Sequence, residues 1–556
     1  MIHIGFTNSF VCLLLAGTML STSTQAQDKT FNLEEATIAE IQNAISTGSV
    51  TGKAIVQLYL ERIAAYDKAG PKLNSIITVN PKAAEEAAAL DLERAQKGPR
   101  GPLHGIPVLL KDNVDTFDMA TTNGSAILKN AIPPKDAIIT KALRDAGAVI
   151  LGKAAMGEFA GGSYNSVTGQ TINPFHLKRN TGGSSAGSGA AISANFAVLA
   201  IGTDTSTSVR GPSSYTGIVG LRPTTGLISR SGIAPKNLNF DSAGPMARTV
   251  TDVTLMLNVV ATRDPTDPLN AKTWGEMDKR DPSLKSGVDF TKALDRGAIK
   301  GKKFGVPLDL YQGDPEIVAL AQKALDDIRR LGGETVDIKF DPEFIENHLR
   351  GGVTKMRELS DYRFREDWEK YLATFTSPDV PKTVADFVRI YEDVVMKSPL
   401  PVEDSVMRLL KTSMTRSTSA PEYIEFLEKL MPKWTAEKMA VFEKYGIDAL
   451  VFPYVPTFAS PIENPAYKIE DPTFVKSSAP VPATMSGYSS VGFPSIVVPM
   501  GYGSQGLPMT ITFFGKPYED AKVIGFAYAY EQATNHRKPS PIVPALPGET
   551  IKMKSK

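Results

Sequence analysis

The chain has 556 residues, of which 42% are apolar and 22% are charged, the composition of an ordinary globular protein. Its 61 basic and 60 acidic side chains leave a formal net charge of +1, which gives no reason to expect nucleic acid or an acidic surface as a partner. Five scattered histidines include no pair at the i, i+4 spacing of a zinc helix, so a metal enzyme is not favoured.

An apolar segment near the N-terminus has the length of a signal-peptide core. It covers residues 10–20, and Thr24-Gln25-Ala26 offers a small-residue cleavage site, although no Lys or Arg precedes it. The segment is too short to span a bilayer as a helix. We therefore expect residues 1–26 to be a signal peptide, and the mature protein to be periplasmic or secreted without stable membrane insertion. Cleavage would also remove Cys12, the one cysteine, so no disulfide or cysteine nucleophile is predicted.

The next part of the chain alternates between helical and strand-like segments. Thr51 is predicted to cap a helix, and a second helix is predicted over residues 81–96. Apolar runs of strand length follow at residues 106–110, 148–151 and 197–201, separated by a helix at 140–146 and another that opens near Ser188. Apolar strands with little alternation, separated by helices, predict a sheet covered on both faces.

The second half repeats this pattern and then departs from it. Strands are predicted at residues 303–307 and 334–338, around a helix that begins at the capping pair Asp314-Pro315. Residues 341–446 are helical and richly charged, and we interpret them as a helical insertion over the active-site face. Apolar runs at 449–452 and 495–499 indicate that the sheet then resumes. We predict an α/β fold with a single large domain over residues 28–545 and a polar C-terminal tail over 546–556.

Hydroxyl side chains are concentrated between residues 181 and 210. A Gly/Ser-rich segment at 181–189 is followed by an apolar run and by the polar loop 202–210, and glycines let backbone N–H groups approach a small bound group closely. Upstream, Lys111 ends the apolar run of Gly-Ile-Pro-Val-Leu-Leu-Lys-Asp-Asn, residues 105–113. Two hydroxyls and a lysine, with no histidine nearby in sequence, predict acyl transfer by a Ser–Ser–Lys relay.

These motifs resemble the amidase signature family, whose members hydrolyse carboxylic amides and sometimes esters. The resemblance is dense over residues 51–264 and returns near 452–453 and 493–495. It implies a mixed sheet, with Lys111 as the base, Ser184 as a bridging serine in a cis peptide and Ser208 as the nucleophile. It also implies an oxyanion hole formed by the backbone of Thr205, Ser206 and Thr207. Many relatives have two glycines at the last two positions, so the side chains there put substrate preference in question.

The chemistry of these residues sets conditions on each of them. Lys111 can act as a base only when it is neutral, which requires burial to lower its pKa. Ser184 would then pass a proton between Lys111 and Ser208. Asp204 and Arg210 are expected to hold the loop by hydrogen bonds. Three further residues are weaker candidates: Met156 and Phe159 could line the acyl pocket or pack in the core, and Ser185 could have a supporting role.

Other interpretations remain open. An esterase or aryl acylamidase would use the same triad, whereas the amidase subunit of a tRNA-dependent amidotransferase would be at odds with an export signal. An α/β-hydrolase would use Ser185 in Gly183-Ser184-Ser185-Ala186-Gly187 with His536, but residues 179–182 are not strand-like. The P-loop-like run at 147–153 lacks its Ser/Thr, because Ala154 follows Lys153. We expect an exported amidohydrolase acting on a small-molecule amide or ester, without cofactor, metal or nucleic acid, as a monomer or homodimer.

Overall fold

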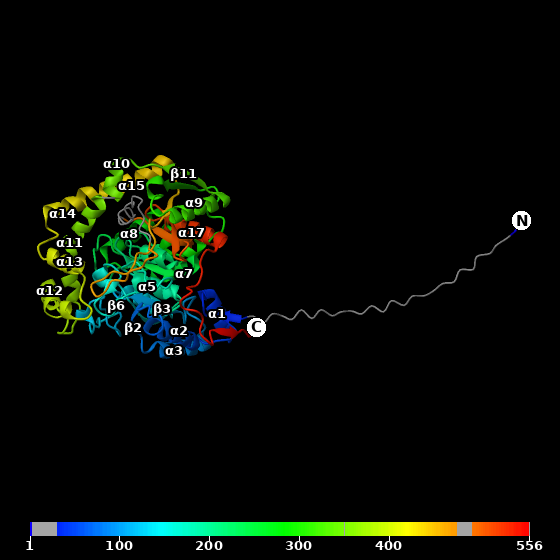
Figure 1. The fold of residues 1–556 in the computed structure, drawn as a ribbon, viewed down its shortest axis with the longest axis horizontal. Coiled ribbons are helices and arrows are strands. Elements are labelled where there is room, and N and C mark those ends of the chain that lie inside the picture. The colour runs from blue at the N-terminus through cyan, green and yellow to red at the C-terminus, as the bar shows by residue number, and fades with distance from the viewer. Residues whose placement is uncertain (3–29, 350, 475–491, 555–556) are drawn as a thin grey trace.

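The computed structural model describes residues 1–2, 30–349, 351–474 and 492–554, without the side chains of 351–354, 356–357 and 360. The predicted signal peptide, residues 1–26, lies almost entirely outside the described residues. Within those ranges, no helix has both the length and the apolar character needed to cross a membrane. Figure 1 shows the described chain gathered around one central sheet, with the segment from α10 to α15 curving along one side.

One mixed sheet forms the centre of the molecule. Four neighbouring pairs in it are parallel, and the others are antiparallel. Its strands lie in the order β11 (Glu334–Ile338), β10 (Lys303–Pro307), β12 (Ala449–Pro453), β14 (Pro508–Phe514), β13 (Ser495–Tyr502), β8 (Val219–Arg222), β9 (Ser242–Ala247), β7 (Leu199–Asp204), β3 (Pro107–Lys111), β4 (Val149–Ala154) and β2 (Ile76–Val79).

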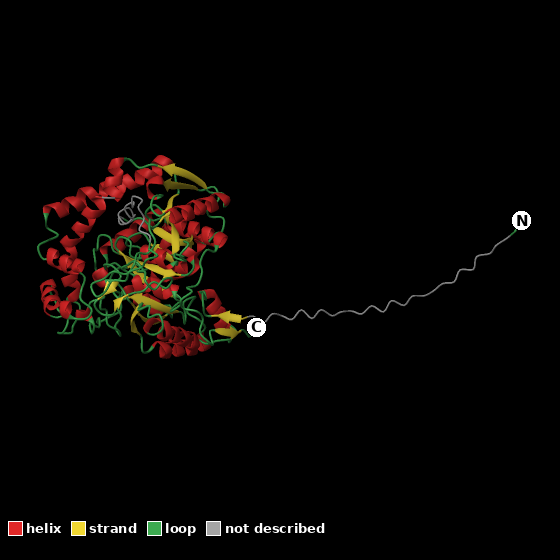
Figure 2. Cartoon of the chain, viewed as in Figure 1, coloured by secondary structure: helices red, strands yellow, loops and turns green. Residues whose placement is uncertain are grey.

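The sheet is covered on both faces. Every residue of β3, β4, β7 and β14 is buried, and successive side chains of a strand point to opposite faces, so both faces must be covered. Figure 2 shows helices flanking the sheet, and the predicted α/β fold is confirmed. In the described part of the chain, the α-helices outside the insertion are α1 (Ile38–Ser46), α2 (Gly52–Arg62), α3 (Ala83–Lys97), α4 (Ile138–Asp145), α5 (Ala186–Ser193), α6 (Arg210–Thr216), α7 (Val250–Val260), α8 (Pro268–Arg280), α9 (Pro315–Arg330) and α17 (Asp520–Thr534).

Local sequence signals account for several of these boundaries. The side chain of Thr51 accepts a hydrogen bond from the N–H of Ala54 at 3.1 Å and begins α2, as predicted. The carboxylate of Asp314 accepts from the N–H of Glu316 at 2.9 Å and begins α9. At the other end of the chain, β15 (Thr550–Lys552) pairs with β1 (Thr30–Asn32), so part of the segment expected to be a tail packs against the fold.

The chain between β11 and β12 is helical over the predicted helical insertion, residues 341–446. Buried hydrogen bonds tie the insertion to the rest of the fold; among them, Tyr371 donates to Asp115 Oδ1 at 2.7 Å, and Tyr391 donates to Glu158. These contacts hold its helices beside the carboxyl ends of the central strands. The helices are α10 (Pro342–Leu349), α11 (Gly351–Leu372), α12 (Val384–Asp393), α13 (Asp404–Ser413), α14 (Pro421–Glu425) and α15 (Met431–Tyr445).

Candidate active site

Lys111 is the last residue of β3, and its side chain is fully buried. Because β3 and β7 are parallel neighbours, their carboxyl ends meet and bring Lys111 against Thr203. Lys111 Nζ lies 2.7 Å from Ser184 Oγ, 2.8 Å from Thr203 Oγ1 and 3.2 Å from the Thr203 carbonyl oxygen. Burial lowers the pKa of Lys111 from 10.5 to about 7, although the carboxylates of Asp204 and Asp241 act in the opposite direction. Lys111 therefore meets the condition of being partly neutral near neutral pH.

Ser184 follows a cis peptide bond between Gly183 and Ser184, as the resemblance implies. The backbone is crowded here: a Cβ added to Gly183 would lie 1.7 Å from the carbonyl oxygen of Gly162, so only glycine fits. The N–H of Gly157 donates to the Ser184 carbonyl at 3.1 Å. These contacts fix the backbone of Ser184 while its hydroxyl remains beside Lys111.

Ser208 lies in the loop of residues 205–208, between β7 and α6. The buried side chain of Arg210 holds this loop by two hydrogen bonds: it donates to Asp204 Oδ2 at 3.1 Å and to the Ser206 carbonyl at 2.7 Å. Asp204 also accepts from Arg222 at 3.0 Å. Burial alone would raise the pKa of Asp204, but the two guanidinium groups hold it well below its usual range. The buried ion cluster thus positions the loop, which is the role expected for Asp204 and Arg210.

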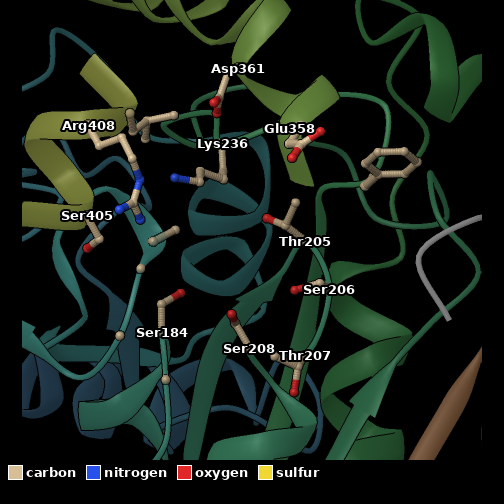
Figure 3. Close-up of a pocket in the computed structure, with 16 residues that line it drawn as sticks. Ser184, Thr205, Ser206, Thr207, Ser208, Lys236, Glu358, Asp361, Ser405 and Arg408 are labelled. Carbon is tan, nitrogen blue, oxygen red and sulfur yellow. The ribbon is translucent and has the colours of Figure 1, made fainter. Parts of the chain in front are cut away.

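Ser184 and Ser208 both face a cavity of about 480 Å³ (Figure 3). Within the described residues, Ser208 Oγ has no hydrogen-bond partner, and the N–H groups of Thr207 and Ser208 donate to none. These groups are therefore available to a bound molecule. The lining residues are Ala160, Gly161, Gly162, Gly183, Ser184, Thr205, Ser206, Thr207, Ser208, Lys236, Phe240, Glu358, Asp361, Ser405, Arg408 and Leu409.

Three residues considered for substrate contact do not line this cavity. Met156 and Phe159 are buried, and the Phe159 ring packs 5.1 Å from that of Trp368 in an apolar cluster of the helical insertion. Ser185 is also buried, and it donates to the Thr203 carbonyl at 3.2 Å. Of the two alternatives given for Phe159, its ring has the core position, because it packs against aromatic residues of the helical insertion.

The structure does not bring a histidine to Ser185. Of the described histidines, His536 contacts the Tyr530 ring and lies 3.9 Å from Asp327, whereas His348 is 2.7 Å from Glu437. The chain before Gly183 is not a strand, as the sequence indicates. No group of three or more His, Cys, Asp or Glu side chains that could hold a metal ion occurs in the part of the chain that the structure describes.

Sequence reasoning missed several residues of the site. Thr203 is a partner of Lys111, and Asn113 donates to Thr203 Oγ1 at 3.1 Å. Both residues could have been predicted, because Thr203 directly precedes Asp204 and Asn113 follows two residues after Lys111. The lining residues of the helical insertion carried no such signal, because charged residues on a helix are usually solvated. Those residues are Glu358, Asp361, Ser405, Arg408 and Leu409.

One cavity brings together a hydroxyl and backbone N–H donors that have no partner among the described residues, and a second hydroxyl bonded to a buried lysine. This is a set of groups that can generate a nucleophile, move its proton and stabilise a developing oxyanion.

The comparisons with known proteins agree with this chemistry. The amidase family model matches residues 54–524. One subunit of the glutamyl-tRNA(Gln) amidotransferase of Geobacter metallireducens is 32% identical over 520 residues, covering 90% of this chain and 98% of that protein. A protein of Arabidopsis thaliana described as a probable amidase is 31% identical over 551 residues, covering 96% and 98%. The solved structure of the peptide amidase from Stenotrophomonas maltophilia is similar with a TM-score of 0.79 and 33% identity, covering 92% of this chain and 99% of that one.

Proposed function

The chain belongs to the amidase family, whose enzymes hydrolyse carboxylic amide C–N bonds, and we propose that it does so through an acyl-enzyme on Ser208. Lys111 is the base and Ser184 the proton relay. The observation that carries the proposal is the 2.7 Å contact between Lys111 Nζ and Ser184 Oγ, at a lysine whose pKa burial lowers to about 7. No cofactor takes part in this chemistry.

The proposed steps conserve every atom and proton. Ser208 Oγ attacks the amide carbon, its proton passes to Ser184, and the Ser184 proton passes to Lys111 Nζ. On collapse, the relay returns a proton to the leaving nitrogen, which departs as an amine. Water then attacks the acyl-enzyme through the same relay and releases the carboxylic acid. Neutral Lys111 is restored at the end of the cycle.

The developing oxyanion is proposed to bind the backbone N–H groups of the 205–208 loop. Such donors commonly contribute about 3–4 kcal/mol each to the transition state. The ion cluster of Asp204, Arg210 and Arg222 supports this role, since it fixes the loop from behind. The side chains of Ser206 and Thr207 also line the cavity and narrow it relative to a pair of glycines.

Two substitutions test the assignment. Ser208→Ala should abolish turnover of amides and esters, while His536→Ala, which removes the histidine of the α/β-hydrolase alternative, should leave it intact. A Ser208→Ala variant with full activity on every aryl, aliphatic and peptide amide and on the matching esters would refute the proposal. The same substrate panel separates an amidase from an esterase or aryl acylamidase that uses these residues.

We also propose that the protein is exported and acts on its own, as a monomer or homodimer. The apolar segment at residues 10–20 supports export. The likeness to one subunit of an amidotransferase favours instead a role inside a multi-subunit, tRNA-dependent enzyme. N-terminal sequencing of the protein from its native host discriminates the two: a mature N-terminus near Gln27 in a periplasmic or secreted fraction supports export, and retention of Met1 in the cytoplasm contradicts it.

A further inference from the structure

Four charged side chains line the cavity above the two serines: Lys236, Glu358, Asp361 and Arg408. They come from a loop, from α11 and from α13. Among the described residues, no group forms an ion pair or a hydrogen bond with any of these four side chains. Charged groups left without partners beside a reaction centre commonly find them in a ligand.

The backbone of Lys236 is hydrogen-bonded to Asp241, next to the 205–208 loop. The N–H of Lys236 donates to Asp241 Oδ2 at 2.8 Å, and the other oxygen of this carboxylate accepts from Thr205 Oγ1 at 2.6 Å. One carboxylate therefore ties Lys236 to the 205–208 loop. The Lys236 side chain is half-buried, with its ammonium group 5.5 Å from the centre of the Phe364 ring. Burial lowers the pKa of Lys236 to about 8, although the carboxylates of Asp361 and Asp241 act in the opposite direction.

Charges of both signs face the cavity. In Figure 3 the Lys236 ammonium and the Arg408 guanidinium lie on the Ser184 side of the cavity, whereas Asp361 and Glu358 project from α11. Neither carboxylate lies within the 4.0 Å of an ion pair with Lys236. A bound anion beside Lys236 would supply the hydrogen-bond acceptor that its ammonium group lacks among the described residues.

We propose that Lys236 is a specificity-determining residue that selects amide substrates carrying a carboxylate. The inference rests on the proposed function, because the carboxylate would bind in the cavity where Ser208 reacts. A carboxylate on the acyl part and one on the leaving amine share this chemistry, and the experiment distinguishes them. A cationic substrate is the opposing outcome, since its charge would face Lys236.

Two pairs of substrates test the proposal in the full chain. Glutaryl and pentanoyl para-nitroanilide differ in an acyl-side carboxylate, and para-acetamidobenzoate and acetanilide differ in one on the amine. The readout is the ratio of kcat/KM, charged over neutral, within each pair. Lys236→Met should lower this ratio about 10- to 100-fold for one pair, which is the usual effect of losing a hydrogen bond to a charged group. The change should appear in KM. Lys236→Arg should largely retain it.

The control variant is Lys272→Met, which removes the same charge from the exposed side of α8 and should leave both ratios unchanged. An equal loss on both members of each pair after Lys236→Met would overturn the proposal. So would a wild-type enzyme that disfavours both charged substrates.

A binding measurement separates this inference from the proposed function. In the Ser208→Ala variant, calorimetry should show the carboxylate member of one pair binding about tenfold more tightly than its neutral partner. Addition of Lys236→Met should remove that difference. Charge-selective binding without turnover in the wild type would contradict the proposed function alone. Turnover without charge-selective binding would contradict the role of Lys236 alone.

Discussion

Replacing Lys111 by methionine should remove activity and, near neutral pH, relieve the fold of a buried charge. Folding lowers the pKa of Lys111 from 10.5 to about 7. The unfolded chain therefore holds a proton that the folded chain releases between these two pH values. Stability must rise with pH across this window, so the cost of burying Lys111 is largest below pH 7 and vanishes above pH 10.5.

The magnitude follows from linkage. At pH 7 the lysine costs the fold about 4 kcal/mol, and at pH 9 about 2 kcal/mol. Lys111→Met also loses the contacts of Nζ with Ser184 and Thr203, which costs about 1 kcal/mol for each lost bond. The free-energy cost of these lost hydrogen bonds does not change with pH. The stability of the variant relative to wild type should therefore fall by about 2 kcal/mol between pH 7 and pH 9, whatever the constant offset.

Urea unfolding of both proteins at the two pH values, followed by tryptophan fluorescence, measures this difference. Other buried groups titrate in both proteins and cancel. Lys272→Met, which removes an exposed lysine, controls for the loss of one positive charge. If the difference between Lys111→Met and wild type changes by less than about 0.5 kcal/mol, Lys111 does not lose its proton on folding and the relay lacks its base.

Three further outcomes are expected. Lys111→Arg should lower kcat/KM for amides about 10²- to 10⁴-fold, and less for activated esters, since guanidinium stays protonated; near-normal amide turnover would exclude lysine as the base. Wild-type kcat/KM for amides should rise with pH through about 7 and stay high under mildly alkaline conditions; a flat pH profile would contradict this. Tyr391→Phe removes the donor to buried Glu158 and should lower the free energy of unfolding by about 1–3 kcal/mol in urea, whereas no change would mean that this tie is dispensable.

The sequence predicted the elements that carry the chemistry because their signals are local. Apolar runs without alternation marked β3 and β7. The motifs around Lys111, Ser184 and Ser208 can be recognised in a single sequence from the order and spacing of their residues. That Lys111 meets Thr203 follows from the parallel pairing of β3 with β7. The residues of a strand do not specify which strand lies next to it in a sheet, so this contact required the structure.

The wall of the cavity could not be predicted for the same reason. Glu358 and Asp361 stand three residues apart on a charged helix, which is also the pattern of a solvated face. Lys236 sits in a loop where a lysine normally points into water. Phe159 lies beside the catalytic motifs in sequence, yet its ring packs against α11 of the helical insertion. Long-range packing decides each of these cases.

Burial explains how Lys111 can be neutral beside a carboxylate. Asp204 and Asp241 both favour the charged form of Lys111. The complete burial of the Lys111 side chain is the larger effect, because removing an ammonium group from water disfavours its charge, and it lowers the pKa of Lys111 to about 7. Asp204 is itself paired with Arg210 and Arg222, and these ion pairs hold the 205–208 loop. Under the proposed function, the site therefore combines a loop fixed by ion pairs with a lysine that burial keeps partly neutral.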